Sequence, residues 1–458
     1  MTADTDARDV VVVGGGTAGC FAAATAATEG LDVVLLERKP EAEAGRIACG
    51  DAIKGKSTFP DVIDRERLKA ESFTNQSISR GIFENPQSGD SLEITFGETG
   101  AVVDRFAYGQ VLLDETDRAG VEIHYETVVN DVIQPDERVD GVVAVRNGDP
   151  VRYEADVVID AAGVLSVLQD QAELSASTFD TNVDYSQFCS AYREVLEVPD
   201  PVEWDDALVF KPTQELGYLW YFPRSPTEIN AGLGFQMTEE PMQLVDALKA
   251  DLVDRPEFAD ATVTNKLGAA LPTRRPLDSA VHPGFVAVGD AAAHVNPCTG
   301  GGIPGAAKAG HWAAEVAADA IDDGDVSESA LWAYNERVQT DFGKRFAAMD
   351  CYNIFGTAHE LDDLVSVITA IPGQQLVDAI GKKGTAKMGL TLKLKALFET
   401  FGHWDVLYEL YKVQDVAASL KDVYDSYPSS PGGFDAWRAE RDAVMDELYA
   451  ITGADPKY

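Results

Sequence analysis

Three glycines near the start of the chain, Gly14, Gly16 and Gly19, have the spacing GxGxxG, and Glu37 follows 18 residues after the last of them. Glycines at this spacing permit a tight turn and let the backbone approach a pyrophosphate at the N-terminus of a helix. A carboxylate at the later position can accept hydrogen bonds from ribose hydroxyls. These four residues therefore predict a dinucleotide site.

A second group of residues alternates aromatic side chains at positions 218, 220 and 222. Side chains alternate between the two faces of a strand, so Tyr218, Trp220 and Phe222 are expected to share one face. Gly232 and Gly234 are expected to share a face on the next strand, after a loop of hairpin length. The rings and the missing side chains could form a narrow apolar slot, or the rings could cover the glycines in ordinary sheet packing.

The segments around the glycine motif have the order of a dinucleotide-binding unit. Asp9–Val13 is a β-branched run, an alanine-rich stretch continues to Thr28, and Val33–Leu36 is a second apolar run that ends at Glu37. Strand, glycine turn, helix, strand and acid in succession are far more specific than an isolated glycine motif.

Later segments predict further strands and a second glycine motif. The strands are expected at Val121–Tyr125, Gly141–Val145, Asp156–Ile159 and Phe285–Val288. Asp290 follows the last of them at its carboxyl end, where open α/β sheets bind ligands. Gly300–Gly302 precede an expected helix, Ile303–Ala320, whose N-terminal amides and dipole can face an anionic group.

The strongly acidic composition excludes nucleic acid as a partner. Of 458 residues, 77 are Asp or Glu and 37 are Lys or Arg, so the net charge is −40. A nucleic-acid surface needs clustered cations. The acids are dispersed along the chain, and such self-repulsion is relieved when salt shortens the Debye length to about 3 Å at 1 M. We therefore expect a halophilic setting.

The cysteines and apolar runs predict an intracellular protein without a metal site. The five cysteines form no CxxC pair and have no metal-ligand spacing, so we expect reduced thiols. The first residues have no pattern of a secretory signal, and no window of 18 consecutive apolar residues exists. The expected location is the cytoplasm.

Over residues 9 to about 320, these motifs resemble the FAD-binding framework of the p-hydroxybenzoate hydroxylase superfamily. The matching segments are Gly14–Gly19 with Glu37, Val103–Phe106, Asp160–Gly163, Gly289–Ala292, Pro297 and Gly300–Ile303. Two more segments are similar to signatures of the geranylgeranyl reductase family: Cys49-Gly50-Asp51, and Tyr218–Pro223 followed by Gly232-Leu233-Gly234.

The resemblance implies FAD as the cofactor and an α/β (α+β) fold with three parts. A discontinuous Rossmann-type FAD-binding domain is expected at 1–60, 101–170 and 265–345, an antiparallel β-sheet substrate domain at 61–100 and 171–264, and a C-terminal helical domain at 346–458. Asp290 resembles the family residue that binds the ribityl chain. The implied cofactor-binding residues are Gly14, Gly16, Ala18, Gly19, Glu37, Ala48, Cys49, Arg105, Val129, Gly163, Asp290, Gly301, Gly302 and Ile303.

The implied reaction is saturation of C=C bonds in geranylgeranyl chains of archaeal-type glycerophospholipids. It requires a hydride, which reduced flavin can supply from N5, and a proton. Tyr218, Trp220, Phe222, Gly232 and Gly234 are the expected substrate-binding residues. Tyr218 and Trp220 are also expected to be catalytic, because aromatic faces can stabilise developing positive charge.

The resemblance implies Cys49 as the proton donor, because its counterpart in the family lies beside the flavin ring, and a thiol with an ordinary pKa of about 8.5 is protonated at neutral pH. The alternative is a small buried apolar cysteine. Cys298 could compete for the role, and His294 could relay a proton.

The expected partners are a polyprenyl lipid and an external electron donor. No second GxGxxG unit follows residue 40, so the donor is expected to be a ferredoxin, a deazaflavin or NAD(P)H. A lipid substrate also implies peripheral contact with the inner face of the cell membrane. An apolar set in the C-terminal part could form a docking or tunnel-lining face, although internal packing is favoured: Leu390, Leu392, Leu394, Leu397 and Phe398.

Two other functions remain open. An aromatic hydroxylase of the same superfamily usually has an arginine after the serine of the motif that begins at Asp160, and none stands between Ser166 and Gln169. A non-catalytic or quinone-linked electron-transfer flavoprotein tends to bring clustered cysteines for an iron–sulfur centre, which this sequence lacks.

Overall fold

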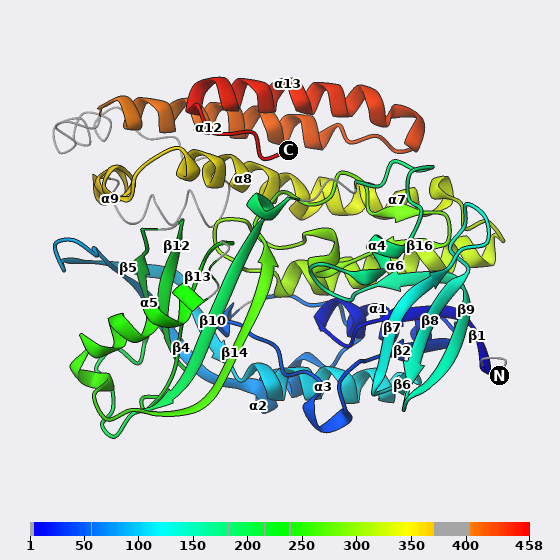
Figure 1. The fold of residues 1–458 in the computed structure, drawn as a ribbon, viewed down its shortest axis with the longest axis horizontal. Helices are drawn as coiled ribbons and strands as arrows, with labels where there is room; N and C mark the ends of the chain where they lie inside the picture. Colours follow the sequence, from blue (N-terminus) through cyan, green and yellow to red (C-terminus); the bar gives the residue numbers. More distant parts are fainter. Residues whose placement is uncertain are drawn as a thin grey trace.

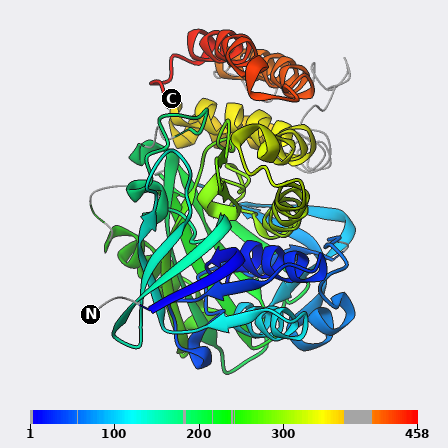
Figure 2. The same cartoon turned by 90° about the vertical axis from the view of Figure 1, so that its right-hand side faces the viewer.

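The computed structural model describes residues 4–55, 57–180, 184–214, 216–237, 240, 242–370 and 404–458. Two β-sheets lie beside each other beneath a layer of C-terminal helices (Figure 1). The view from the side shows the last two helices on the outer side of that layer (Figure 2).

The first sheet is the mostly parallel sheet that the glycine motif predicted. Its main strand order is β15-β16-β9-β1-β2-β6. β8 pairs with β9 and β7 pairs with β8, both antiparallel. The strands are β1 (Asp4–Val13), β2 (Val33–Leu36), β6 (Glu122–His124), β7 (Thr127–Ile133), β8 (Gly141–Arg146), β9 (Asp149–Asp160), β15 (Val281–His282) and β16 (Phe285–Ala287).

Two of these strands begin earlier than expected. β1 and β9 pair in parallel from Asp4 opposite Val151 to Val13 opposite Asp160. The added residues of β9 also form the hairpin with β8, so each extension has a partner for its backbone groups. Val10–Val13 are buried as a continuous run because helices and strands cover both faces of a parallel sheet.

Helices α1 (Thr17–Thr28), α3 (Arg105–Arg118) and α6 (Ile303–Asp322) pack on the first sheet and on one another. Alanines of α1 and α6 join the core of the sheet, while Phe21 and Ala24 of α1 meet Tyr108 and Leu112 of α3. The side chains of α1 are small, so the helix fits between these two neighbours.

The second sheet carries the aromatic strand. Its order is β14-β10-β13-β12-β11-β4-β5-β3, and only the pair of β4 and β11 is parallel. It therefore differs from a purely antiparallel sheet at one pair. The strands are β3 (Ala52–Lys54), β4 (Phe73–Glu84), β5 (Ser91–Val103), β10 (Phe188–Glu197), β11 (Ala207–Pro212), β12 (Gly217–Pro223), β13 (Glu228–Gln236) and β14 (Thr262–Pro272).

The two faces of this sheet differ as the alternation of side chains predicts. Leu219 and Tyr221 of β12 belong to an apolar cluster with Leu244 and Leu248 of α5 (Met242–Val253). The side chains at positions 220 and 222 belong to a different cluster on the opposite face. We call that opposite face the inner face of the second sheet.

The remaining helices form the layer above the two sheets or short connections. They are α2 (Arg65–Ser72), α4 (Val167–Gln171), α7 (Glu328–Val338), α8 (Lys344–Thr357), α9 (Leu361–Ala370), α12 (Trp404–Asp425) and α13 (Phe434–Thr452). The apolar set expected in the C-terminal part lies outside the described residues: Leu390, Leu392, Leu394, Leu397 and Phe398. Within the described part of the chain, no helix combines the length and apolar character needed to cross a bilayer.

A buried ion cluster fastens the last helix to the rest of the fold. Asp278 accepts hydrogen bonds from Arg441 of α13 and, at 3.4 Å, from Nε of Arg275. Burial acts to raise the pKa of Asp278, but the charges of Arg275 and Arg441 outweigh burial and hold the pKa well below its usual range. The carboxylate is therefore ionised and depends on its two arginines.

We predict that Arg441→Met lowers the free energy of unfolding by about 3 kcal/mol, because it removes one partner of a buried charge. Chemical denaturation measures this loss, and Arg438→Met, at an exposed pair with Asp435, should cost less than about 1 kcal/mol. The stabilisation from a lowered carboxyl pKa is present above the unfolded value of about 3.9 and is lost as the pH falls from there through the lower folded pKa. Equal losses in the two variants would contradict the assignment.

Candidate functional site

The glycine turn after β1 is closed on one side and open on the other. A Cβ at Gly14, where φ is +107°, would lie 2.3 Å from the Ala161 oxygen, and one at Gly19 would lie 1.9 Å from the Gly14 oxygen. Gly16 caps α1 without a side-chain hydrogen bond, and nothing described lies within 4 Å of the position of its Cβ. The first amides of α1 therefore face space that an anionic group can enter.

Glu37 is fixed beside this turn. It follows β2, is buried, and accepts hydrogen bonds from the amides of Gly15 and Lys39, both at 2.9 Å. The amide of Thr127 donates to the Glu37 carbonyl at 3.0 Å, so β7, which carries Val129, begins next to the acid. The predicted ribose ligand thus stands next to the predicted phosphate turn.

Arg105 lies in the core rather than in solvent. It is 5% exposed, and its Nη2 donates to the Thr17 hydroxyl at 2.9 Å, while its Nη1 has no hydrogen-bond partner among the described residues. Burial raises the pKa of Asp290 and the charge of Arg105 opposes that rise. A buried guanidinium with a free N–H beside the start of α1 suits an anionic ligand.

Asp290 and the second glycine motif come together at the start of α6. Asp290 lies in a short turn, Gly289–Ala292, and a Cβ at Gly302 would stand 3.8 Å from its Oδ1. Gly302 is the N-cap of α6 and makes no side-chain cap. The predicted residues Gly301, Gly302 and Ile303 therefore stand at a helix N-terminus without a side-chain cap, beside a carboxyl group.

Ala18 and Gly163, two more of the predicted cofactor residues, stand close to these turns. Ala18 of α1 packs against Gly289, where an added Cβ would lie 2.9 Å from the alanine methyl group. Gly163 follows β9 with φ of +89° and has open space where a Cβ would stand. Together with the open amides of α1, these features fit FAD, and the assignment of the individual cofactor-binding residues stays a prediction.

A buried polar network joins the loop of Cys49, Gly50 and Asp51 to the second sheet. Asp51 is fully buried, and its Oδ2 accepts hydrogen bonds from Arg224 Nε at 2.8 Å and Nη2 at 2.6 Å and from Asn230 Nδ2 at 2.6 Å. Asn230 also donates to the Cys49 carbonyl at 2.8 Å and accepts from Trp220 Nε1 at 2.9 Å. One amide side chain thus positions the loop and the indole together.

The thiol of Cys49 is protonated at this site. The Asp51 amide donates to Cys49 Sγ at 3.3 Å, a contact that favours the thiolate and is outweighed by two other effects. Burial raises the pKa of Cys49, and the charge of Asp51 raises it further. The thiol therefore keeps its proton at neutral pH, as a proton donor must.

The aromatic side chains occupy the inner face of the second sheet in contact with this loop. A Cβ at Gly50 would lie 3.1 Å from the Phe222 ring and 3.5 Å from the Trp220 ring. The Trp220 and Phe222 rings stack at 6.2 Å, and the Tyr218 hydroxyl donates to the Thr299 carbonyl at 2.8 Å. The three rings therefore extend from the Cys49 loop to the loop that precedes α6.

Gly232 makes room for an indole rather than for an open slot. Trp220 lies opposite it in the sheet, and a Cβ at Gly232 would lie 2.5 Å from the indole and 2.6 Å from Cβ of Arg193. The packing alternative considered for the glycines therefore holds at this position. Gly234 lies on the same face, opposite Tyr218, with Cys189 Sγ at 3.1 Å from the place of a Cβ.

The two weaker candidates from the sequence have other roles in the fold. Burial lowers the pKa of His294 to about 3, and its Nδ1 accepts from the Gly289 amide at 3.1 Å, so the ring is neutral and supports the turn. Burial raises the pKa of Cys298 to about 12, and its thiol donates to the Met349 carbonyl at 3.0 Å.

The sequence reasoning gave no role to Asp51, Arg224 or Asn230. Asn230 could have been found, because it precedes Gly232 and Gly234 at a spacing of two and so shares their face. Arg224 directly follows the aromatic signature, but its pairing with Asp51 spans 173 residues and leaves no local pattern.

The comparisons with known proteins agree on a flavin enzyme. Residues 9–214 match the family model described as FAD dependent oxidoreductase. A digeranylgeranylglycerophospholipid reductase from Sulfolobus acidocaldarius is 30% identical over 96% of this chain and 98% of its own, and one from Methanothrix thermoacetophila is 30% identical over 85% of this chain and 98% of its own.

Solved structures share the fold at lower identity. A geranylgeranyl bacteriochlorophyll reductase-like protein from Thermoplasma acidophilum superposes with a TM-score of 0.72 at 23% identity, over 89% of this chain and 100% of its own. A myxobacterial FAD-dependent halogenase superposes with a TM-score of 0.61 at 20% identity, over 87% of this chain and 97% of its own.

We predict that Gly232→Ala displaces the indole of Trp220, because the added methyl group would stand 2.5 Å from it. The tryptophan emission should shift and the bound flavin should be retained, since no cofactor residue is altered. The matched control is Gly432→Ala, where the nearest atom lies 4.0 Å away and the emission should stay unchanged. An unchanged emission in Gly232→Ala would contradict the packing of Trp220 on Gly232.

Proposed function

We propose, from the premise that this chain belongs to the digeranylgeranylglycerophospholipid reductase family, that it saturates C=C bonds of geranylgeranyl chains in archaeal-type glycerophospholipids. The chain is an FAD-dependent oxidoreductase. The observation that carries the proposal is the Asp51 network, which holds a protonated thiol against an aromatic surface and fastens both to the second sheet.

The reaction needs a hydride at one alkene carbon and a proton at the other. FAD, when bound and reduced, supplies the hydride. Cys49 supplies the proton from Sγ, and its raised pKa keeps that proton on the thiol until an alkene is in place. Asn230 and Asp51 position the loop that carries the thiol.

The aromatic side chains bind the chain and stabilise charge. Trp220 and Phe222 are almost fully buried, so water is excluded from their rings. Their faces attract positive charge that develops on a tertiary carbon, an effect that desolvation strengthens. Tyr218 is the ring farthest from the Cys49 loop, and its hydroxyl holds the loop before α6 by a hydrogen bond to Thr299.

The source of electrons and the route of the lipid complete the proposal. The electron donor is external, a ferredoxin, a deazaflavin or NAD(P)H, and the lipid reaches the protein through peripheral contact with a membrane. Salt supports this contact, because the surface carries net negative charge and headgroups are often anionic.

The proposal predicts that the anaerobically reduced holoenzyme, mixed with digeranylgeranyl phospholipid in high salt, regains its yellow flavin absorbance. The lipid mass should rise by two hydrogens for each step. Absorbance spectra and mass spectrometry measure the two changes, and fully saturated lipid serves as the control. Flavin that stays reduced would favour an electron carrier, and aerobic NADPH consumption with a phenol would favour a hydroxylase.

Cys49→Ala should lower kcat by about 100-fold or more, because it removes the general acid. The content of FAD, measured in the same samples, separates loss of the proton donor from loss of the cofactor, and Cys351→Ala, at a buried cysteine of α8, should keep wild-type kcat.

The pH profile gives a second measurement of the same assignment. The wild-type rate should fall only above the ordinary thiol pKa of about 8.5, because burial raises the pKa of Cys49 and keeps it protonated to higher pH. This alkaline limb should be absent from Cys49→Ala. Full turnover by that variant would remove Cys49 from the mechanism.

A further inference from the structure

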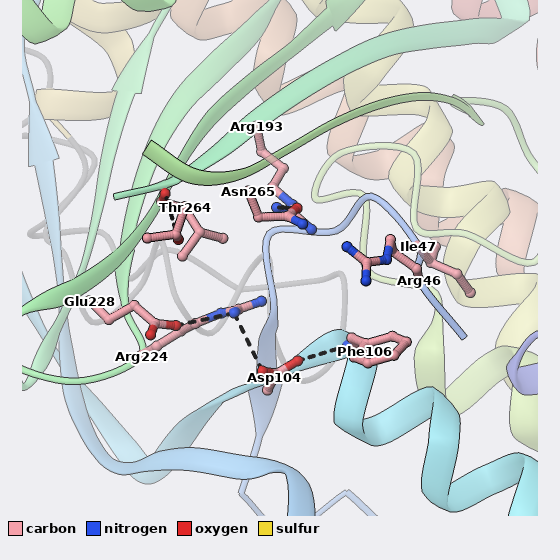
Figure 3. A pocket seen from close by; sticks show the side chains of 10 residues that line it. Arg46, Ile47, Asp104, Phe106, Arg193, Arg224, Glu228, Thr264 and Asn265 are labelled. Atoms are coloured by element: carbon pink, nitrogen blue, oxygen red, sulfur yellow. Dashed lines mark hydrogen bonds and ion pairs between the residues drawn. The ribbon is translucent and has the colours of Figure 1, made fainter. Parts of the chain in front are cut away.

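A cavity of about 240 Å³ lies next to the Asp51 network and is lined by three arginines. Their guanidinium groups converge on it from three sides (Figure 3). We call it the arginine pocket, and its lining residues are Arg46, Ile47, Asp104, Phe106, Arg193, Val195, Arg224, Glu228, Thr264 and Asn265.

The acids near the pocket converge on a single arginine. Arg224 pairs with Asp51 at 2.6 Å, with Glu228 at 3.2 Å and with Asp104 at 3.6 Å. Its positive charge is therefore already matched within the protein.

The other two arginines of the pocket have no carboxylate partner among the described residues. Arg193 is 4% exposed and donates to Asn265, and its Nε has no hydrogen-bond partner there. Arg46 lies over the Phe106 ring at 4.8 Å, and its Nε likewise has none. Both guanidinium groups have an N–H donor without a partner in the part of the chain that the structure describes, although the protein has a net charge of −40. A bound anion would satisfy these donors and balance the two positive charges.

The pocket lies on the same face as the aromatic side chains. Trp220, Gly232 and Arg193 stand opposite one another on β12, β13 and β10, so their side chains share the inner face. The next row contains Phe222 and Asn230 on the same two strands. One face of the sheet thus passes from aromatic rings to guanidinium groups, which matches a molecule that joins hydrocarbon to an anion.

We propose that the arginine pocket binds the phosphate of the lipid substrate, with Arg193 and Arg46 as the phosphate ligands, an inference that rests on the proposed function. Arginine suits this role because its planar guanidinium donates two parallel hydrogen bonds to phosphate oxygens. Thr264 and Asn265 add polar groups at the same wall. The volume of the pocket corresponds to about eight water molecules at roughly 30 Å³ each. This is enough for a phosphate with adjoining glycerol atoms but not for a polyprenyl chain.

The phosphate ligands are separate from the expected cofactor residues. None of the ten lining residues is among the residues that would hold FAD, and the pocket includes three strands of the second sheet. The pyrophosphate of the cofactor would bind at the N-terminal amides of α1. The anion in the arginine pocket is therefore a second one.

The test compares two substrates that differ only in the headgroup, digeranylgeranylglycerol phosphate and neutral digeranylgeranylglycerol, in the FAD-loaded enzyme. Arg193→Gln and Arg46→Gln should each raise KM for the phosphate lipid at least tenfold and change KM for the neutral lipid less than twofold. Arg193→Lys, which keeps the charge, should recover part of the loss. Arg438→Gln, at an exposed arginine of α13, is the matched control and should change neither.

A binding measurement separates this proposal from the proposed function. Titration calorimetry with glycerol phosphate should give heat with the wild type and with Arg438→Gln, and at least tenfold weaker binding with Arg193→Gln. If the wild type binds glycerol phosphate through Arg193 but reduces neither lipid, the proposed function fails and the anion site stands. An equal rise in KM for both lipids in Arg193→Gln would overturn the assignment to the lipid headgroup. So would a variant in which only the KM for a phosphate-bearing electron donor rises.

Discussion

The candidate site depends on one buried carboxylate. Asp51 is fully buried at φ of +68°, and only its Oδ2 has partners among the described residues. Burial raises the pKa of Asp51 although Arg224 and Asn230 oppose that rise. A buried ion pair of this kind contributes little net stability, and an apolar replacement of similar volume is often as stable. We infer that the network serves to position the Cys49 loop, because stability alone does not account for it.

The parts of the fold that were predictable are those with a local signal. The unit from β1 to Glu37 and the separation of positions 218, 220 and 222 from 219 and 221 follow from glycine spacing and from alternation along one strand. The parallel pair of β4 and β11 joins segments more than one hundred residues apart, and nothing in either strand specifies this partner. Sheet order beyond adjacent strands is set by tertiary packing.

The same distinction applies to the site. The residues proposed to hold FAD stand in motifs whose spacing carries their chemistry, and the structure brings Asp290 next to Gly302 and Arg105 next to Thr17. Arg46 and Arg193 belong to no motif and lie in segments far apart in sequence. Their importance follows from what surrounds them in space, because three acids form ion pairs with Arg224, and no carboxylate in the described part of the chain pairs with Arg46 or Arg193.

The arrangement also bears on how one site could act on several double bonds of a long chain. The loop of Cys49 is fixed from two sides. Asn230 links it to Trp220 by hydrogen bonds, and Asp51 links it to Arg224. A phosphate fixed on the same face would limit how far the chain can move past the thiol. Double bonds at different distances from the headgroup would then need different foldings of the chain against the rings. Aromatic surfaces permit this, since their contacts with hydrocarbon have little directional preference.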